Sequence, residues 1–123
     1  MIDHEHFFGT FLKEKKNTLL IEAFHDISAS VGIVLTDINT TWVLILTEGK
    51  LTSLECDATN NCDVYYQMET EVFQGIVERQ FSPQHAFFVK KVDIKGDLFM
   101  GMKIAKLLDS FFEQYPYVIG GRG

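Results

Sequence analysis

The chain has 123 residues and a formal net charge of −6, with 46% hydrophobic and 23% charged residues. This length fits one domain with a sizeable core, and the acidic balance argues against non-specific nucleic-acid binding, which depends on basic patches. No apolar run approaches the roughly 20 residues that span a bilayer, and the acidic N-terminus lacks the apolar centre of a signal peptide. We therefore expect a cytoplasmic protein with one domain over residues 1–119 and a loose tail over 120–123.

The first two elements that the sequence predicts are helices. Residues 3–15 carry phenylalanines and a leucine at helical spacing and end in a charged run. A second helix is predicted over 18–27, with Asn17 as its N-cap. Its apolar side chains recur on one side, so we expect that side to be buried. The residues of this stripe are Leu20, Ile21, Phe24 and Ile27.

The middle of the chain changes to short segments that are rich in β-branched and aromatic residues. The four predicted strands are 31–37, 41–47, 50–57 and 62–69. Asp37-Ile38-Asn39-Thr40 and Glu48-Gly49 are typical turn sequences between neighbouring strands. We therefore expect the first three strands to form an antiparallel meander.

The last third returns to helices around one further strand. The predicted elements are a helix over 70–81 capped by Thr70, a helical turn after Ser82, a strand over 91–95 and a helix over 97–113. Ser82 is a favourable N-cap, and Pro83 sits at the first helical position, where its missing N–H costs nothing. Gly96-Asp97 turns the chain and can cap the final helix. The pattern predicts an α+β fold: a five-stranded, mainly antiparallel sheet with helices packed on one face.

The stretch from Ser82 to Leu108 has a specific combination of motifs. It joins a Pro-Gln-x-Ala-Phe run, a Lys-x-x-Ile-Lys-Gly strand and a methionine-rich helix with short spacings. The residues concerned are Pro83, Gln84, Ala86, Phe87, Lys91, Ile94, Lys95, Gly96, Met100, Met102, Lys103 and Leu107. This combination resembles the sterol carrier protein (sterol-binding domain) family. Lys90 stands where that family often has glycine, and Asp97 where asparagine is common.

The resemblance implies an apolar tunnel between the sheet and the helices, closed in part by the C-terminal helix. In the resembled family the ligands include sterols, fatty acids and fatty acyl-CoA. The motifs carry over tunnel-lining roles to Phe87, Ile94, Met100, Ile104 and Leu108. Helix geometry adds Phe73, Ile76 and Val77 as further candidates.

The final helix is unusually apolar around its circumference. The apolar side chains of residues 98–112 occupy an arc of roughly 220°, whereas a helix that lies on one surface needs only about 100°. They are Leu98, Met100, Met102, Ile104, Ala105, Leu107, Leu108, Phe111 and Phe112. We therefore expect this helix to be covered on two sides, by another helix, a partner chain or an apolar ligand. Periodicity alone favours ordinary core packing, while the resemblance favours a ligand, which flexible methionines would suit.

Charge is unevenly spread along the chain. Residues 31–89 carry two basic and eight acidic side chains, whereas residues 90–123 carry six basic and four acidic. The candidates for a basic rim that meets a negative headgroup are Lys90, Lys91, Lys103 and Lys106. A solvated lysine face on an amphipathic helix is the alternative.

The sequence predicts no catalytic, cofactor or metal site. The two histidines of Asp3-His4-Glu5-His6 would point to opposite sides of a helix. Cys56 and Cys62 offer neither a disulfide framework nor the spacing of a zinc site. The sequence also lacks the motifs of nucleophile elbows, phosphate loops, dinucleotide sites and zinc proteases.

These observations predict non-catalytic binding or carrying of a lipid-like ligand: a fatty acid, fatty acyl-CoA, isoprenoid or sterol-like molecule. The alternative is a protein-interaction or accessory module of lipid metabolism whose C-terminal helix is buried by a partner or by a second copy. A ligand predicts a closed internal void, whereas a partner predicts a large exposed apolar patch. Transient membrane contact and a homodimer are compatible with both.

Overall fold

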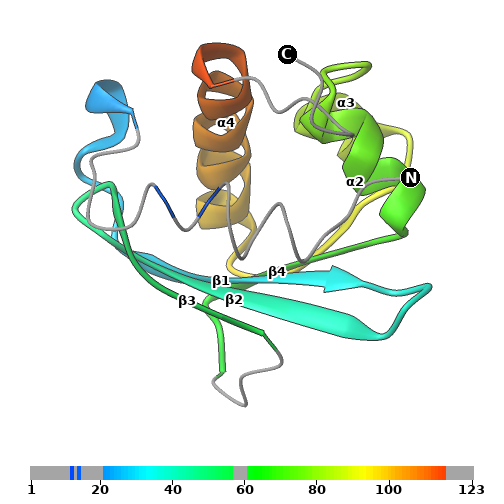
Figure 1. Ribbon diagram of the computed structural model, residues 1–123, viewed down its shortest axis with the longest axis horizontal. Coiled ribbons are helices and arrows are strands. Elements are labelled where there is room, and N and C mark those ends of the chain that lie inside the picture. Colours follow the sequence, from blue (N-terminus) through cyan, green and yellow to red (C-terminus); the bar gives the residue numbers. More distant parts are fainter. Residues whose placement is uncertain (1–11, 13, 15–20, 57–60, 116–123) are drawn as a thin grey trace.

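The computed structural model describes residues 12, 14, 21–56 and 61–115. The predicted helix over 3–15, apart from Leu12 and Glu14, lies outside the described residues, as does the predicted tail over 120–123. Within the described part a five-stranded sheet forms one layer and the helices lie together on one of its faces (Figure 1). The predicted α+β fold class is confirmed.

The sheet has the strand order β3-β2-β1-β4-β5. Its strands are β1 (Ala29–Leu35), β2 (Thr40–Thr47), β3 (Lys50–Cys56), β4 (Val64–Met68) and β5 (Asp93–Gly96). The first three strands form the expected antiparallel meander, and β5 is antiparallel to β4. Strand β4, however, pairs in parallel with β1, so the sheet is mixed and only mainly antiparallel.

Local backbone chemistry explains the tight turn of the meander. Glu48 and Gly49 both have positive φ, at 52° and 76°, as a two-residue hairpin turn requires. Asn39, in the turn between β1 and β2, also has a positive φ of 51°, which asparagine tolerates better than most residues. Both predicted turns therefore lie between neighbouring strands.

Four helical elements of the described ranges form the second layer. They are η3 (Glu22–Phe24), α2 (Thr70–Val77), α3 (Pro83–Phe88) and α4 (Leu98–Gln114). As predicted, the Ser82 hydroxyl caps α3 by accepting from the His85 N–H at 3.0 Å. The Asp97 carboxylate caps α4 by accepting from the Met100 N–H at 3.0 Å.

The predicted helix over 18–27 is wrong in its described part, which holds only the three-residue 3₁₀ helix η3. The reason is that Ile27 and Ser28 already belong to the sheet layer. The Gly49 N–H donates to the Ile27 carbonyl at 2.8 Å, and the Glu48 N–H donates to the Ser28 hydroxyl at 2.9 Å. Ile27 is buried as predicted, but by strand-edge contacts and not by a helical stripe.

Helix α2 is shorter than predicted. It ends at Val77, because Arg79 turns left-handed with φ of 60° and the Gln80 N–H closes back on the Gly75 carbonyl at 2.8 Å. Thr70 is the first helical residue and not the cap. Its N–H and its hydroxyl both donate to one carboxylate oxygen of Asp37, each at 2.8 Å. This contact ties the start of α2 to the turn between β1 and β2.

Candidate functional site

An apolar cavity of about 50 Å³ lies between the sheet and helices α2, α3 and α4. The sheet contributes Val31, Ile33, Leu44, Leu46, Tyr66, Met68 and Ile94 to its wall. The helices contribute Phe73, Ile76, Pro83, Gln84, Phe87, Met102, Ile104, Ala105, Leu107, Leu108, Phe111 and Phe112. Leu12 and Val92 complete the lining. By the same measure one water needs about 10–15 Å³, so the void has room for about four waters.

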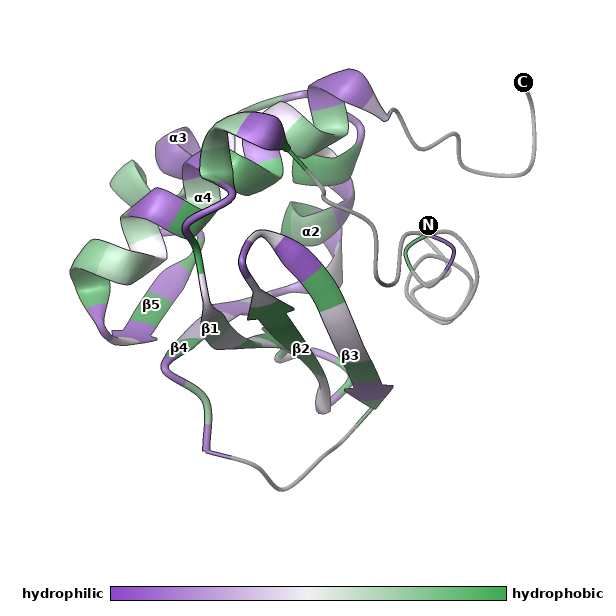
Figure 2. Ribbon diagram, turned by 90° about the vertical axis from the view of Figure 1, so that its left-hand side faces the viewer, coloured by the Kyte–Doolittle hydropathy of each residue, from purple (hydrophilic) through white to green (hydrophobic). Residues whose placement is uncertain are grey.

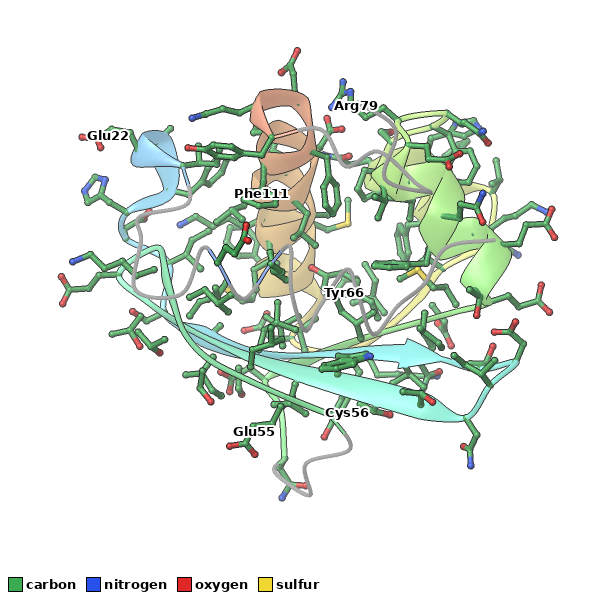
Figure 3. All side chains as sticks on the ribbon, in the orientation of Figure 1. Glu22, Glu55, Cys56, Tyr66, Arg79 and Phe111 are labelled. Carbon is green, nitrogen blue, oxygen red and sulfur yellow. The ribbon has the colours of Figure 1, made fainter. Side chains whose placement is uncertain are left out.

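Strand and helix periodicity explain why these residues meet. Alternate residues of a strand share one face, so Val31 and Ile33 of β1 point to the same side as Leu44 and Leu46 of β2. On α4, Ile104 and Leu107 are completely buried toward this layer. Figure 3 shows Tyr66 on the helical side of the sheet and Phe111 on α4 above it.

Tyr66 is a polar residue in this wall whose hydroxyl is already engaged. It donates to the backbone carbonyl of Gly101, which ties β4 to α4. Burial raises the pKa of the Tyr66 phenol well above its ordinary value, so the group stays neutral and remains a donor. Gly101 lets α4 approach β5 closely, because a Cβ there would lie 2.8 Å from Cγ2 of Ile94.

Gln84 is the other polar residue of the wall, and its amide oxygen is buried without a hydrogen-bond partner among the described residues. A buried acceptor that is left unpaired costs about 1–3 kcal/mol. Gln84 belongs to the motif that resembles the sterol carrier protein family, but a position in the cavity wall was not predicted for it. The i, i+3 spacing from Gln84 to Phe87 places both on one side of α3 and was the available signal.

Six of the eight predicted ligand contacts lie on the cavity wall: Phe73, Ile76, Phe87, Ile94, Ile104 and Leu108. Met100 and Val77 do not. Met100 is half-buried against the core, and Val77, the last residue of α2, is buried within the core. Met68 and Met102 belong to the wall and were not predicted as contacts. A ligand role for the predicted residues stays a prediction.

None of the four predicted rim lysines lines the apolar cavity. Lys103 forms an ion pair with Asp26, with 2.9 Å between Nζ and Oδ2, and this contact lowers the pKa of Asp26. Lys106 is exposed. Lys90 and Lys91 line a separate open hollow of about 450 Å³. Acidic Glu69 and Asp93 share that hollow, so its charge is mixed.

Met68 borders both the apolar cavity and the open hollow. Its side chain is buried and comes from the last residue of β4. The thioether is unbranched and changes rotamer readily. Met68 therefore lies between the cavity and the hollow beside Lys90 and Lys91.

The final helix is covered on fewer sides than its composition suggested. Its middle and C-terminal parts are buried by the sheet and by α3, but Leu98 is 51% exposed and Phe99 is 83% exposed. The expectation that Leu98 is covered is therefore wrong for this chain alone. The reason is that α4 begins beyond the edge strand β5, where neither the sheet nor another described helix extends.

Within the described ranges, no group of three or more His, Cys, Asp or Glu side chains is placed to hold a metal ion. The Asp3-His4-Glu5-His6 run lies outside these ranges. Burial raises the pKa of the Cys62 thiol, which disfavours the reactive thiolate. No helix within the described residues is long and apolar enough to cross a membrane.

Solved structures share this fold at low sequence identity. The sterol carrier protein domain 2 of Helicoverpa armigera has a TM-score of 0.62 at 20% identity, over 94% of this chain and 90% of that one. The UbiJ-SCP2 ubiquinone synthesis protein has a TM-score of 0.66 at 13% identity, over 89% of this chain and 99% of that one.

The inverting sec-alkylsulfatase Pisa1 from Pseudomonas sp. contains a similar fold as part of a larger chain. Its TM-score is 0.66 at 20% identity, over 88% of this chain but only 16% of the sulfatase. No curated protein matches the sequence. The family model of the SCP-2 sterol transfer family matches residues 8–109, which include every described element except the last turn of α4, and the chain therefore belongs to the SCP-2 sterol transfer family.

Proposed function

We propose that this protein binds a lipid-like ligand in the apolar cavity between the sheet and helices α2, α3 and α4, and carries it without covalent chemistry. The single observation that supports this most is the composition of the cavity wall. Of its 21 lining residues, 19 are apolar, and the other two are Gln84 and Tyr66. Affinity would come from burying hydrocarbon, at about 0.8 kcal/mol for each methylene. Membership of the SCP-2 family supports lipid binding in general.

The ligand must widen the cavity, because about 50 Å³ is too small for a long alkyl chain. The side chains best suited to yield are Met68, Met102 and Leu108, which line the void and are flexible or half-buried. Met68 offers a route of entry from the hollow beside Lys90 and Lys91. A charged headgroup would then remain at the surface, where these two lysines are exposed.

Two measurements test the carrier role. Lipid should be released from the protein purified from cells and be detected by mass spectrometry after denaturation. A fluorescent fatty-acid analogue should also bind the delipidated protein and be displaced by unlabelled lipid. If neither lipid nor analogue is found, the proposed function is wrong.

Variants of α4 connect that binding to the cavity. Leu108→Trp should fill the void and weaken binding of the analogue, and Ile104→Glu should abolish it by placing a charge in the buried wall. Phe99→Glu, on the exposed start of the same helix, is the matched control and should bind normally. Circular dichroism must show a retained fold, and Leu108→Trp is the informative variant if Ile104→Glu unfolds.

The exposed apolar residues favour a second proposal, that the chain docks on an anionic membrane surface while its ligand exchanges. We define the β5 edge as residues 88–99, which run from the end of α3 through β5 to the start of α4. Both Phe88 and Phe99 are 83% exposed there. Figure 2 shows that the end of α3 and the start of α4 flank β5 on the same side of the molecule.

Charge supports a membrane as the occupant of this edge. The β5 edge carries three lysines and two aspartates in a protein whose net charge is −6. Asp97 caps α4 and Asp93 pairs with Lys95 at 3.1 Å, so Lys90 and Lys91 remain for an anionic headgroup. Exposed aromatic side chains beside lysines suit the interface of an anionic bilayer.

Flotation with lipid vesicles tests this second proposal. The protein should float with phosphatidylcholine vesicles that contain phosphatidylglycerol and less with pure phosphatidylcholine. Phe88→Ser/Phe99→Ser should stay in solution, while Ile38→Ser, at an exposed apolar residue outside the β5 edge, should not change flotation. A dimer in size-exclusion chromatography that Phe99→Ser dissociates would instead assign the edge to a second copy, and no flotation would reject the membrane.

A further inference from the structure

We infer that Gln84 is the polar anchor of the cavity, and that the ligand group it takes is a neutral hydroxyl at one end of an apolar body. This inference rests on the proposed function, since it names the chemistry of the ligand in the same cavity. It starts from one observation: the Gln84 amide oxygen is buried, lines the cavity and has no hydrogen-bond partner among the described residues.

The rest of the wall leaves this role to Gln84. The hydroxyl of Tyr66 already donates its one hydrogen to the Gly101 carbonyl, so it has no donor left for a ligand. The other residues of the lining are apolar, and no Asp, Glu, Lys, Arg or His is among them in the part of the chain that the structure describes. Within this described wall, the Gln84 amide oxygen is therefore the buried side-chain atom that has no hydrogen-bond partner at all.

The absence of charge from the described wall selects a neutral group. An ionised carboxylate or phosphate placed against Gln84 would lose its hydration without gaining an opposite charge, which is strongly unfavourable. A hydroxyl has the matching chemistry, because it donates to the amide oxygen and adds no net charge. Alcohols and sterol-like or phenolic hydroxyls fit this description, whereas the ionised end of a fatty acid would have to stay at the surface.

The backbone around Gln84 holds its amide in place. Pro83 fixes the first residue of α3, and the Ser82 hydroxyl accepts from the His85 N–H at 3.0 Å. Ala86, two residues on, is completely buried against the core. The amide is therefore presented from a short helix whose start and inner side are both anchored, which limits the loss of conformational freedom on binding.

The test compares three ligands that share a ten-carbon chain, with and without the Gln84 amide. Decan-1-ol, its methyl ether and decanoate at pH 8 compete with a fluorescent fatty-acid analogue for the delipidated protein. The alcohol should bind about tenfold more tightly than the ether, which cannot donate a hydrogen bond. Gln84→Leu should bring that ratio to about one by weakening the alcohol only. Gln80→Leu, an exposed glutamine just before α3, is the matched control and should preserve the ratio.

Each outcome separates the anchor from the carrier role. If the alcohol and the ether bind equally well, or if Gln84→Leu leaves their ratio unchanged, the anchor is wrong while the carrier role stands. If decanoate binds more tightly than the alcohol in a manner that needs Gln84, the neutral ligand class is wrong. If no ligand binds the unmodified protein, both proposals fail.

The melting temperature of the Gln84→Leu variant adds a second test, because a structural role of the amide and a ligand-binding role predict opposite changes in Tm. In the ligand-free protein Gln84→Leu should raise Tm by about 2–6 °C, because it removes a buried acceptor without a partner. Saturating decan-1-ol should raise the Tm of the unmodified protein more than that of the variant. A lower Tm for the ligand-free variant would mean that the amide stabilises the fold and is not held in reserve for a ligand.

Discussion

The cavity wall and the β5 edge are both built from apolar residues, yet they differ in what covers them. The cavity wall draws on seven of the described helices and strands, so that each side chain is covered by another element. The β5 edge uses helix ends next to an edge strand, where no described element follows. Phe87 and Phe88 illustrate the difference: they are neighbours in sequence, but Phe87 lines the cavity and Phe88 is 83% exposed.

This comparison shows that an apolar residue acquires its role from the layer it faces. Inward side chains of α3 and α4 enclose volume, and outward side chains of the same helices are left for a surface. Helix α4 contains both kinds, with Ile104 fully buried and Phe99 exposed within two turns. Substitutions at the two kinds of position should therefore differ in their effect on stability, most of all within α4.

Truncating one residue on each side of α4 tests the contrast directly. Ile104→Ala should lower the free energy of unfolding by about 2–5 kcal/mol, because it leaves a cavity in a fully buried site. Phe99→Ala should change it by no more than about 0.5 kcal/mol. Urea denaturation followed by circular dichroism measures both. Equal losses would mean that the start of α4 is buried in solution.

Gly101 tests how closely α4 packs on the sheet beside the cavity. Gly101→Ala should lower the free energy of unfolding by about 1–3 kcal/mol, although alanine ordinarily favours a helix interior. The new Cβ would lie 2.8 Å from Ile94 Cγ2 and 3.3 Å from Val64 Cγ1. In an Ile94→Ala background the same change should cost less. A gain in stability from Gly101→Ala alone would show that α4 packs more loosely than the distances indicate.

Lys90 tests the backbone conformation at the β5 edge. Its φ of 65° ends α3 in a left-handed residue, with the Lys91 N–H bonded to the Ala86 carbonyl at 2.8 Å. Lys90→Gly should therefore raise the free energy of unfolding by about 0.5–1 kcal/mol. Lys91→Gly, whose φ is not positive, is the control and should not stabilise. Stabilisation by both variants would point to charge and not to backbone conformation.

Substitution of Asp37 should have the smallest effect on stability. Asp37 holds the start of α2, the helix that carries Phe73 of the cavity wall. Hydrogen bonds from the Thr70 N–H and hydroxyl lower the pKa of Asp37 below its ordinary value of 3.8. The carboxylate is the favoured form in the folded state, so its contribution is present above pH 3.8 and is lost as the pH falls through the lowered pKa. Asp37→Ala should therefore lower Tm at pH 7. At a pH below the lowered pKa of Asp37, where the carboxyl group is protonated, the same substitution should hardly change Tm. Asp37→Asn keeps an acceptor oxygen and should show no such pH dependence, and a Tm difference that is constant with pH would contradict this reasoning.

Local sequence chemistry predicted the elements that have strong caps and turns. Ser82 starts α3 and Asp97 starts α4, because each side chain accepts from the backbone N–H three residues on, and Pro83 fixes φ at the first position of α3. The helix over 18–27 failed because Ile27 and Ser28 bond to the β2–β3 turn, which is a contact between distant parts of the chain. Helix α2 ended early because Phe81 packs on Gly75, where a Cβ would lie 2.5 Å from the ring.

The candidate site was predicted to a similar extent. The family resemblance identified Phe87, Ile94, Ile104 and Leu108 as lining residues, and helical spacing identified Phe73 and Ile76. Met100 and Val77 do not line the cavity, since neither a motif nor periodicity says which of two neighbouring apolar layers a side chain enters. Gln84 was not predicted as a lining residue, because a polar residue in a first helical turn ordinarily faces water.

By itself, the sequence determined the α+β class, the antiparallel meander, the capped helices and the resemblance to sterol carrier proteins. These depend on neighbours a few residues apart, through alternation, helical spacing and capping. Only the tertiary structure decided that β4 runs parallel to β1, where the Asp63 N–H donates to the Ser30 carbonyl at 3.0 Å and the Ser30 N–H donates to the Asp63 carboxylate at 3.0 Å. It likewise decided that Gln84 faces the cavity and Phe99 faces solvent, because burial is set by elements that are distant in sequence and meet only in the folded chain.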